Sequence, residues 1–170
     1  MSLYENTVPT FLRILHNIEQ FFDKAQAHAT AKKFELDTLL NARIAPDMFS
    51  LVKQVQIACD TAKFTASRLT GKDAPKFEDN ETTVAQLRDR IGKTRAYLET
   101  FLAKDFQGAE ERKIVMPWAP NKWMTGADYT EQMAMPNFYF HAAATYMILR
   151  HNGVDLGKMD FLGNVNMRDA

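Results

Sequence analysis

The chain has a single cysteine, few glycines and prolines, and no excess of either charge. Because Cys59 has no second cysteine to pair with, neither an intramolecular disulfide nor a cysteine-based zinc site can form. The 7 glycines and 6 prolines are too few for the turns of an all-β sandwich or barrel, so a helical protein is favoured. Lysine plus arginine and aspartate plus glutamate number 21 each, which argues against nucleic acid or an anionic membrane as a partner. The length suits one domain, over residues 1–170.

A long uninterrupted apolar run is also lacking. The most apolar stretch, residues 134–149, is broken by Pro136, Asn137 and His141 and is shorter than the ~20 apolar residues of a membrane span. Residues 1–5 contain no basic cluster before an apolar run, so we expect no secretory signal and a cytoplasmic location. We interpret 134–149 as a helix buried in a globular protein.

Apolar residues recur every three or four positions in several segments, which is the spacing of amphipathic helices. The predicted long helices are 4–27, 46–70, 81–103 and 137–152. Pro9 should kink or restart the first of them, and Pro46 suits the first turn of the second. Residues 29–45 and 104–125 are predicted to be long connections, the latter with a short strand at 112–116.

Two pairs of residues have the spacing of a capping box. Ser2 with Glu5 marks a start for the first helix, and Thr125 with Asp128 marks a further start. Pro136 should then divide this second segment from the last long helix.

The residue that most clearly indicates a site is His141, which lies within the most apolar helix. Asn137 and Thr145 lie one turn before and after it, so the three side chains share one helix face. Histidine in such a place could bind a metal together with a ligand from a neighbouring helix. It could also be a neutral, hydrogen-bonded core residue, and from the residues alone this second role is preferred.

Several blocks of sequence resemble one known family. The blocks are PNFYFH at 136–141, LRHNGV at 149–154, GKMDFLG at 157–163, ARIAPDM at 42–48 and QVQIACD at 54–60. Together they resemble an uncharacterised bacterial family of the DinB-like superfamily. The resemblance implies an all-α, DinB-like four-helix bundle with long crossover connections, which is often dimeric. It also implies a divalent-metal site of three histidines, one from the second helix and two from a His-x-x-x-His pair on the fourth. Some relatives are thiol-dependent transferases or isomerases.

The positions of this chain that match the family's ligands depart from that pattern. When Leu149, Arg150 and Gly153 are matched to the relatives, His141 takes the place of the second histidine and Asn137 that of the first. The second helix has no histidine, so the remaining ligand could come only from Gln56, Gln54 or Asp60. Amide oxygens are poor ligands for zinc or nickel beside imidazole, so we expect a degenerate site in which a divalent metal is bound weakly or not at all.

Three hypotheses for the function follow, and no catalytic residue can be assigned. The preferred one is a small ligand in a polar pocket at the bundle centre, formed by Asn137, His141, Thr145, Gln56 and Gln54. The first alternative is a divalent-metal-dependent enzyme, a hydrolase or thiol-dependent transferase, with Zn or Ni held by His141, Asn137, Gln56 and Asp60. The second is a structural or interaction dimer with no active site. Under each hypothesis we expect a homodimer formed through one apolar helix face. Either of two tryptophans could cap the bundle or contact a substrate, namely Trp118 and Trp123.

Overall fold

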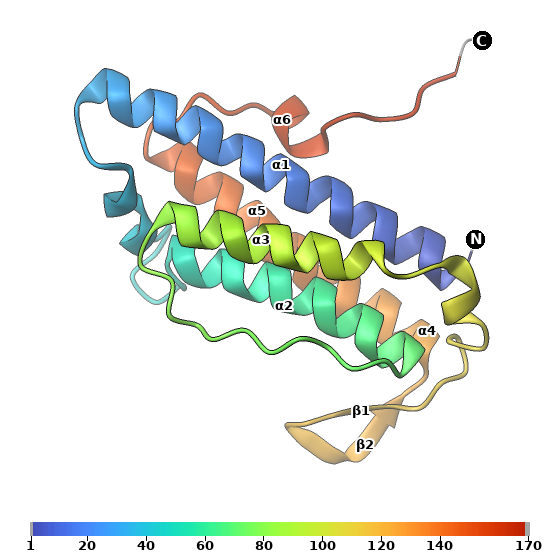
Figure 1. Ribbon diagram of the computed structural model, residues 1–170. Helices are drawn as coiled ribbons and strands as arrows, with labels where there is room; N and C mark the ends of the chain where they lie inside the picture. Colours follow the sequence, from blue (N-terminus) through green and yellow to red (C-terminus); the bar gives the residue numbers. More distant parts are fainter. Residues whose placement is uncertain (1, 169–170) are drawn as a thin grey trace.

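Four long helices lie side by side in the computed structural model, which describes residues 2–168 (Figure 1). The elements, in chain order, are α1 (Leu3–Lys32), η1 (Leu36–Asn41), α2 (Leu51–Thr70), α3 (Val84–Glu99), η2 (Ala103–Phe106), β1 (Ile114–Met116), β2 (Ala119–Met124), α4 (Gly126–Tyr129), η3 (Thr130–Ala134), α5 (Met135–His151) and α6 (Lys158–Leu162). α1 and α2 each pack against both α3 and α5, so the long helices close around one core. The predicted all-α four-helix bundle with long crossovers is confirmed.

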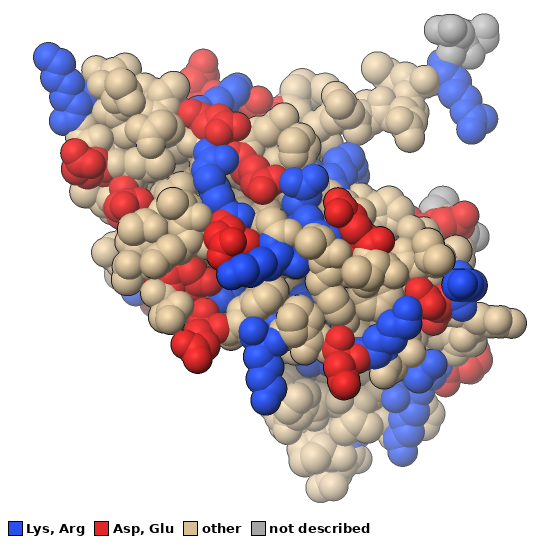
Figure 2. Space-filling view, in the orientation of Figure 1, with Lys and Arg blue, Asp and Glu red and all other residues tan. Residues whose placement is uncertain are grey.

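The core is built from one apolar face of each long helix. Phe11 of α1 meets Phe138 of α5 edge to face, with their ring centroids 4.6 Å apart. Residues with no exposed surface come from all four helices and include Leu15, Ile18, Val55, Ala62, Ile91, Leu98 and Leu149. The outer faces of α1 and α3 carry interspersed charges of both signs, as Figure 2 shows, and Arg95 of α3 pairs with Glu19 of α1 at 2.6 Å. These charged faces are therefore solvated surface.

α1 extends beyond its predicted bounds at both ends. The capping box is confirmed, since the Ser2 backbone N–H donates to Glu5 Oε2 at 2.8 Å and the Glu5 N–H donates to Ser2 Oγ at 3.3 Å. The helix does not restart at Pro9, because one helix runs through it. Pro9 is exposed, so water can solvate the carbonyl whose helical partner is missing.

α2 begins five residues later than the sequence predicted, at Leu51 and not at Pro46. The chain first makes a turn, in which the Met48 N–H donates to the Ala45 carbonyl at 3.0 Å. The Leu51 N–H then donates to the carbonyl of Ala42 at 2.9 Å, which anchors the start of the helix. Pro46 therefore lies in the connection.

α3 is shorter than the predicted 81–103. Its start is defined by a capping box in which Thr83 Oγ1 accepts from the Gln86 N–H at 3.2 Å and Gln86 Oε1 accepts from the Thr83 N–H at 3.1 Å. At the other end, Thr100 Oγ1 donates to the Tyr97 carbonyl at 2.7 Å, and the helix stops at Glu99. Local side-chain bonds to the backbone thus decide both ends.

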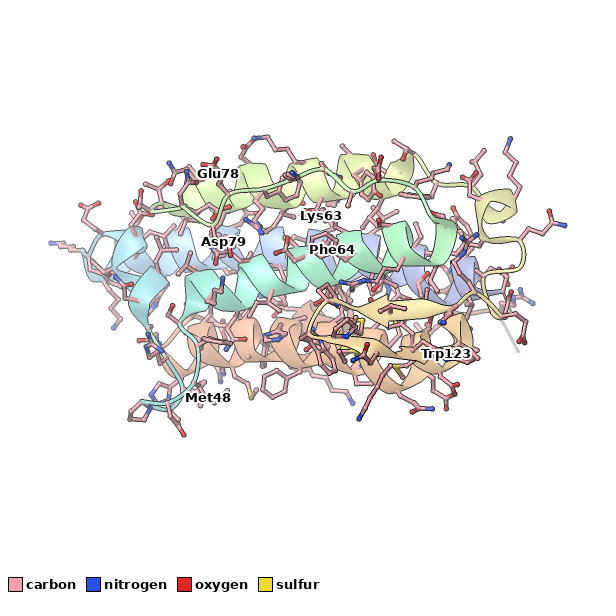
Figure 3. The ribbon with its side chains drawn as sticks, turned by 90° about the horizontal axis from the view of Figure 1, so that it is seen from below. Met48, Lys63, Phe64, Glu78, Asp79 and Trp123 are labelled. Atoms are coloured by element: carbon pink, nitrogen blue, oxygen red, sulfur yellow. The ribbon has the colours of Figure 1, made fainter. Side chains whose placement is uncertain are left out.

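The long connection after α3 contains a β-hairpin, which confirms the predicted short strand. β1 pairs with β2 antiparallel, and the pairing shifts register between Val115 and Met116. The hairpin projects from the bundle beneath α2 and α5 (Figures 1 and 3). Trp118 is 71% exposed and Trp123 is also exposed, so neither tryptophan packs into the bundle.

The segment before α5 passes through a π-helical turn. The Met135 N–H donates to the carbonyl of Thr130, five residues back, and Pro136 follows at the start of α5. The widened turn leaves room for the proline ring, which would clash with the backbone of an uninterrupted α-helix. α4, η3 and α5 therefore follow one another as one continuous helical segment. α5 has the most apolar sequence of the long helices, yet within residues 2–168 no helix is long and apolar enough to span a membrane.

Candidate functional site

His141 is held by a side chain from α2. Its Nδ1 lies 2.7 Å from Gln54 Oε1, and both side chains are buried. Because Gln54 Nε2 donates to the carbonyl of Phe49 at 3.1 Å, Oε1 is the acceptor and Nδ1 of His141 is the donor. The Thr145 hydroxyl donates to the His141 backbone carbonyl at 2.9 Å and so does not touch the imidazole.

The imidazole of His141 is neutral, with one nitrogen free. Burial lowers the pKa of His141 below its ordinary value, since an imidazolium would lose hydration there. Nε2 has no hydrogen-bond partner among residues 2–168, and it is not among the polar atoms sealed from solvent. A free Nε2 lone pair with Nδ1 donating to an oxygen is the state in which histidine binds a metal ion.

The remaining ligands of a three-histidine metal centre do not fit, however. Asn137, which the family resemblance matches to the other α5 histidine, has its amide nitrogen donating to Thr61 Oγ1 at 2.7 Å. The α2 side chain that faces the imidazole is the amide of Gln54. In the described part of the chain, no three His, Cys, Asp or Glu side chains come close enough to share an ion. The donor set that the family resemblance implies is therefore not reproduced by these residues.

Asn137 lies one helical turn before His141 on α5. Together with Thr61 of α2 it borders a cavity of about 120 Å³, which lies between α2, the η3–α5 junction and the hairpin. Its lining residues are Asp60, Thr61, Phe64, Arg68, Met116, Tyr129, Met133, Ala134 and Asn137. Figure 3 looks onto this side of the bundle, where Phe64 lies on α2 between Lys63 and the hairpin. The lining joins polar groups from α2 and α5 to apolar side chains from the hairpin and η3.

The cation of this cavity is Arg68. Its Nη1 donates to the Tyr129 hydroxyl at 2.9 Å, and the same hydroxyl lies 3.4 Å from Thr65 Oγ1. The guanidinium lies over the rings of Phe64 and Tyr129, 5.3 and 5.6 Å from their centroids. No carboxylate within residues 2–168 lies within ion-pair distance of Arg68.

The anion of the cavity, Asp60, belongs to a buried ion cluster. Asp60 Oδ1 lies 2.9 Å from Nη2 of Arg90 and 3.0 Å from Nζ of Lys63. Arg90 also contacts Glu81 at 2.9 Å and Asp79 at 3.1 Å, and the side chains of both cations are only 2% exposed. The other oxygen of Asp60, Oδ2, has no partner in the described residues, and the side chain is 30% exposed.

The ion cluster attaches the connection 71–83 to α2 and α3. Figure 1 shows this connection as the green loop that leads from α2 to α3. Phe77 of this connection covers the Lys63 ammonium, with the nitrogen 4.1 Å from the ring centroid. The pKa of Asp79 is lowered overall. Partial desolvation raises it, but the hydrogen bond from Lys53 and the charge of Arg90 outweigh that effect. Desolvation likewise opposes the charge on Arg90, and its bonds to Glu81 and Asp60 raise the pKa of that guanidinium.

The structure divides the residues predicted for the site into separate groups. Gln54, His141 and Thr145 meet in the core, and Asn137 lies one turn away at the cavity. Gln56 lies on the opposite side of α2, where its amide donates to Glu81 at 2.7 Å. Asp60 lines the cavity, and its Oδ1 is held by two cations of the ion cluster.

Sequence reasoning missed most of the cavity. Thr61, Phe64 and Arg68 were passed over because no motif marks them, although their spacing of three and four residues places them on one face of α2. Met116 comes from the hairpin of the crossover and Tyr129 from α4 directly after it, and nothing in their local sequence indicates where that crossover folds.

Comparison with known proteins agrees with the fold. Residues 3–162 match a family described as a domain of unknown function (DUF1993). A crystal structure of a DinB family member protein from Shewanella denitrificans is 48% identical, with a TM-score of 0.95, over 99% of this chain and 96% of that one. No protein with a curated description matches the chain.

Proposed function

The chain belongs to the DinB family, through a domain of unknown function, and we propose that it binds a small organic molecule in the cavity between α2, α5 and the hairpin. The family membership does not specify a ligand, because one fold supports many functions. The proposal therefore rests on the site.

The observation that carries the proposal is the convergence of polar groups from two helices on one partly apolar cavity. Thr61 of α2 and Asn137 of α5 form its polar rim, and the amide oxygen of Asn137 has no partner among the described residues. Phe64, Met116 and Met133 supply apolar walls. A few placed polar groups in an apolar setting are typical of small-molecule sites.

The size of the cavity restricts the ligand. Drug-sized ligands occupy pockets of roughly 300–1,000 Å³. The cavity here measures about 120 Å³, so the ligand it can enclose has only a handful of non-hydrogen atoms. The sequence predicted a pocket around His141, whereas the proposed pocket lies one turn away along α5. Asn137 belongs to both pockets.

Filling the cavity tests the proposal. Ala134 lines it and is buried, so Ala134→Leu places a larger side chain there without changing any charge. Ala96→Leu, at an exposed position of α3, is the matched control. Ligand-observed NMR against a library of small metabolites should show binding to the wild type and to Ala96→Leu, and its loss in Ala134→Leu. The proposal would be contradicted if no molecule of the library bound to the wild type, or if the molecules that bind the wild type also bound Ala134→Leu.

A second proposal concerns His141, whose neutral imidazole leaves Nε2 free. We propose that this nitrogen holds a divalent cation, zinc or nickel, weakly and as the only histidine ligand. Elemental mass spectrometry after metal saturation and dialysis should show substoichiometric metal in the wild type and none in His141→Ala. Equal metal content in the two proteins would contradict a site at this histidine.

We also propose that two copies of the chain associate through the outer face of α5. Phe140 is 56% exposed, and Met147, which lies about two turns further along α5, is also exposed. Residues 135–149 contain no Asp, Glu, Lys or Arg. An uncharged, half-exposed apolar face of this kind is typical of a protein interface. Light scattering should find a dimer that Phe140→Glu dissociates, and a wild-type monomer at all concentrations would refute the proposal.

A further inference from the structure

The cavity brings together one cation and one anion that are each incompletely paired. Arg68 has five N–H donors, of which the structure assigns one, to the Tyr129 hydroxyl. Its charge is permanent, and its guanidinium lies between two aromatic rings without a carboxylate partner in the described residues. A carboxylate entering the cavity would supply the two parallel acceptors that a guanidinium fork favours.

Asp60 offers the complementary group. Both of its cationic partners contact Oδ1, at 2.9 and 3.0 Å, while Oδ2 has no partner in the structure from residue 2 to 168. Asp60 lines the cavity, and Oδ2 is its carboxylate oxygen without a partner among the described residues. An ammonium group would gain a charge-assisted hydrogen bond there.

The two charged residues are separated along α2. Positions 60 and 68 are two turns apart on α2, a rise of about 12 Å between their backbones. The guanidinium of Arg68 extends back to the level of Thr65, since both contact the Tyr129 hydroxyl. Thr61 and Phe64 of the same helix also line the cavity.

We propose that the ligand of this cavity is a small amino acid in the chemical sense, a molecule whose carboxylate binds Arg68 and whose ammonium binds Asp60. The short aliphatic part between the two charges would contact Phe64, Met116 and Met133. Such a molecule is neutral overall, and so it leaves the charge balance of the neighbouring ion cluster unchanged. This inference rests on the proposed binding function and specifies its ligand class.

Three probes that share a four-carbon chain test the ligand class on the wild-type protein. They are γ-aminobutyrate, butyrate, which lacks the ammonium, and butylamine, which lacks the carboxylate. Glycine, β-alanine and δ-aminovalerate extend the series in length. Titration followed by NMR should show that one of the amino acids binds at least about tenfold more tightly than butyrate and butylamine. Equal affinity for butyrate or for butylamine would overturn the proposal, since one charged end would then be irrelevant.

Arg68→Met provides the second readout, because methionine keeps an apolar chain over Phe64 and Tyr129 but removes the charge. The affinity for the best amino acid should fall at least about tenfold. Arg150→Met, in the last turn of α5 and outside the cavity, is the matched control and should bind as the wild type does. Undiminished binding by a folded Arg68→Met protein would overturn the assignment of the carboxylate.

The ligand class and the binding function can fail separately. If library molecules bind in an Ala134-dependent manner but no amino acid of the series does, the cavity binds ligands and the amino acid assignment is wrong. If neither the library nor the series binds, both proposals are refuted.

Discussion

Replacing Asp60 with asparagine tests how the buried cations of the bundle are stabilised. The carboxylate contacts Lys63 at 3.0 Å and Arg90 at 2.9 Å, and both cationic side chains are almost completely buried. Arg90 retains Glu81 and Asp79 when Asp60 is neutralised. Lys63 retains no carboxylate within ion-pair distance among the described residues, and only the rings of the neighbouring phenylalanines remain near its ammonium.

The magnitude follows from this asymmetry. Removing one partner of a buried ion pair costs about 3–5 kcal/mol, because the other charge stays buried without compensation. Asp60 is 30% exposed, so water offsets part of that cost, and we expect Asp60→Asn to lower the free energy of unfolding by about 2–3 kcal/mol. Lys63→Met removes the buried charge but keeps a chain of similar shape, and it should change stability by no more than about 1 kcal/mol.

Urea unfolding followed by circular dichroism measures these differences. If Lys63 depends on Asp60, the double variant Asp60→Asn/Lys63→Met should be more stable than Asp60→Asn alone by about 1 kcal/mol. Lys93→Met, which breaks the exposed pair of Lys93 with Asp89, is the control and should change stability by less than about 0.5 kcal/mol. The reasoning is refuted if Lys63→Met destabilises as much as Asp60→Asn, or if the effects of the two substitutions simply add.

Three further outcomes are expected. Burial lowers the folded-state pKa of His141, so as the pH falls its imidazole is protonated in the unfolded chain before it is in the folded protein. The free energy of unfolding should therefore fall as the pH drops below about 6.5. His141→Gln should flatten this part of the pH profile measured by urea unfolding. An unchanged slope would show that His141 is not the group responsible. Burial raises the pKa of the Cys59 thiol to about 12, so a thiol reagent should label it only after denaturation, and fast labelling of the native protein would contradict its burial. Trp118 and Trp123 are exposed, so tryptophan emission should move little on unfolding, whereas a large red shift would indicate that they are covered.

The element pattern of this protein could be predicted from its sequence because helices depend mainly on local spacing. The periodicity of apolar residues located all four long helices, and Ser2 with Glu5 located the start of α1. The errors lie at other helix ends. Pro46 has the chemistry of a first helical turn, but the bond from Leu51 to Ala42 fixed the start of α2 further along, and that bond requires the folded connection.

The site was less predictable because its residues are chosen by packing between helices. Gln54 and Gln56 are of one type and two positions apart, which places them about 200° apart around α2. Both faces of α2 are covered, one by α5 and the other by α3 and the connection 71–83. Spacing therefore shows that only one glutamine can reach His141, but it does not show which one.

The sequence by itself determined the fold class and the long helices, because these depend on residue identity and on spacing along single helices. The tertiary structure alone decided that Arg68 of α2, Tyr129 of the crossover and Asn137 of α5 line one cavity. These residues lie far apart in the chain, and their meeting depends on how α2 is turned against α5 and on where the hairpin folds back. Those two choices are made by the packing of the whole core, which no short stretch of sequence encodes.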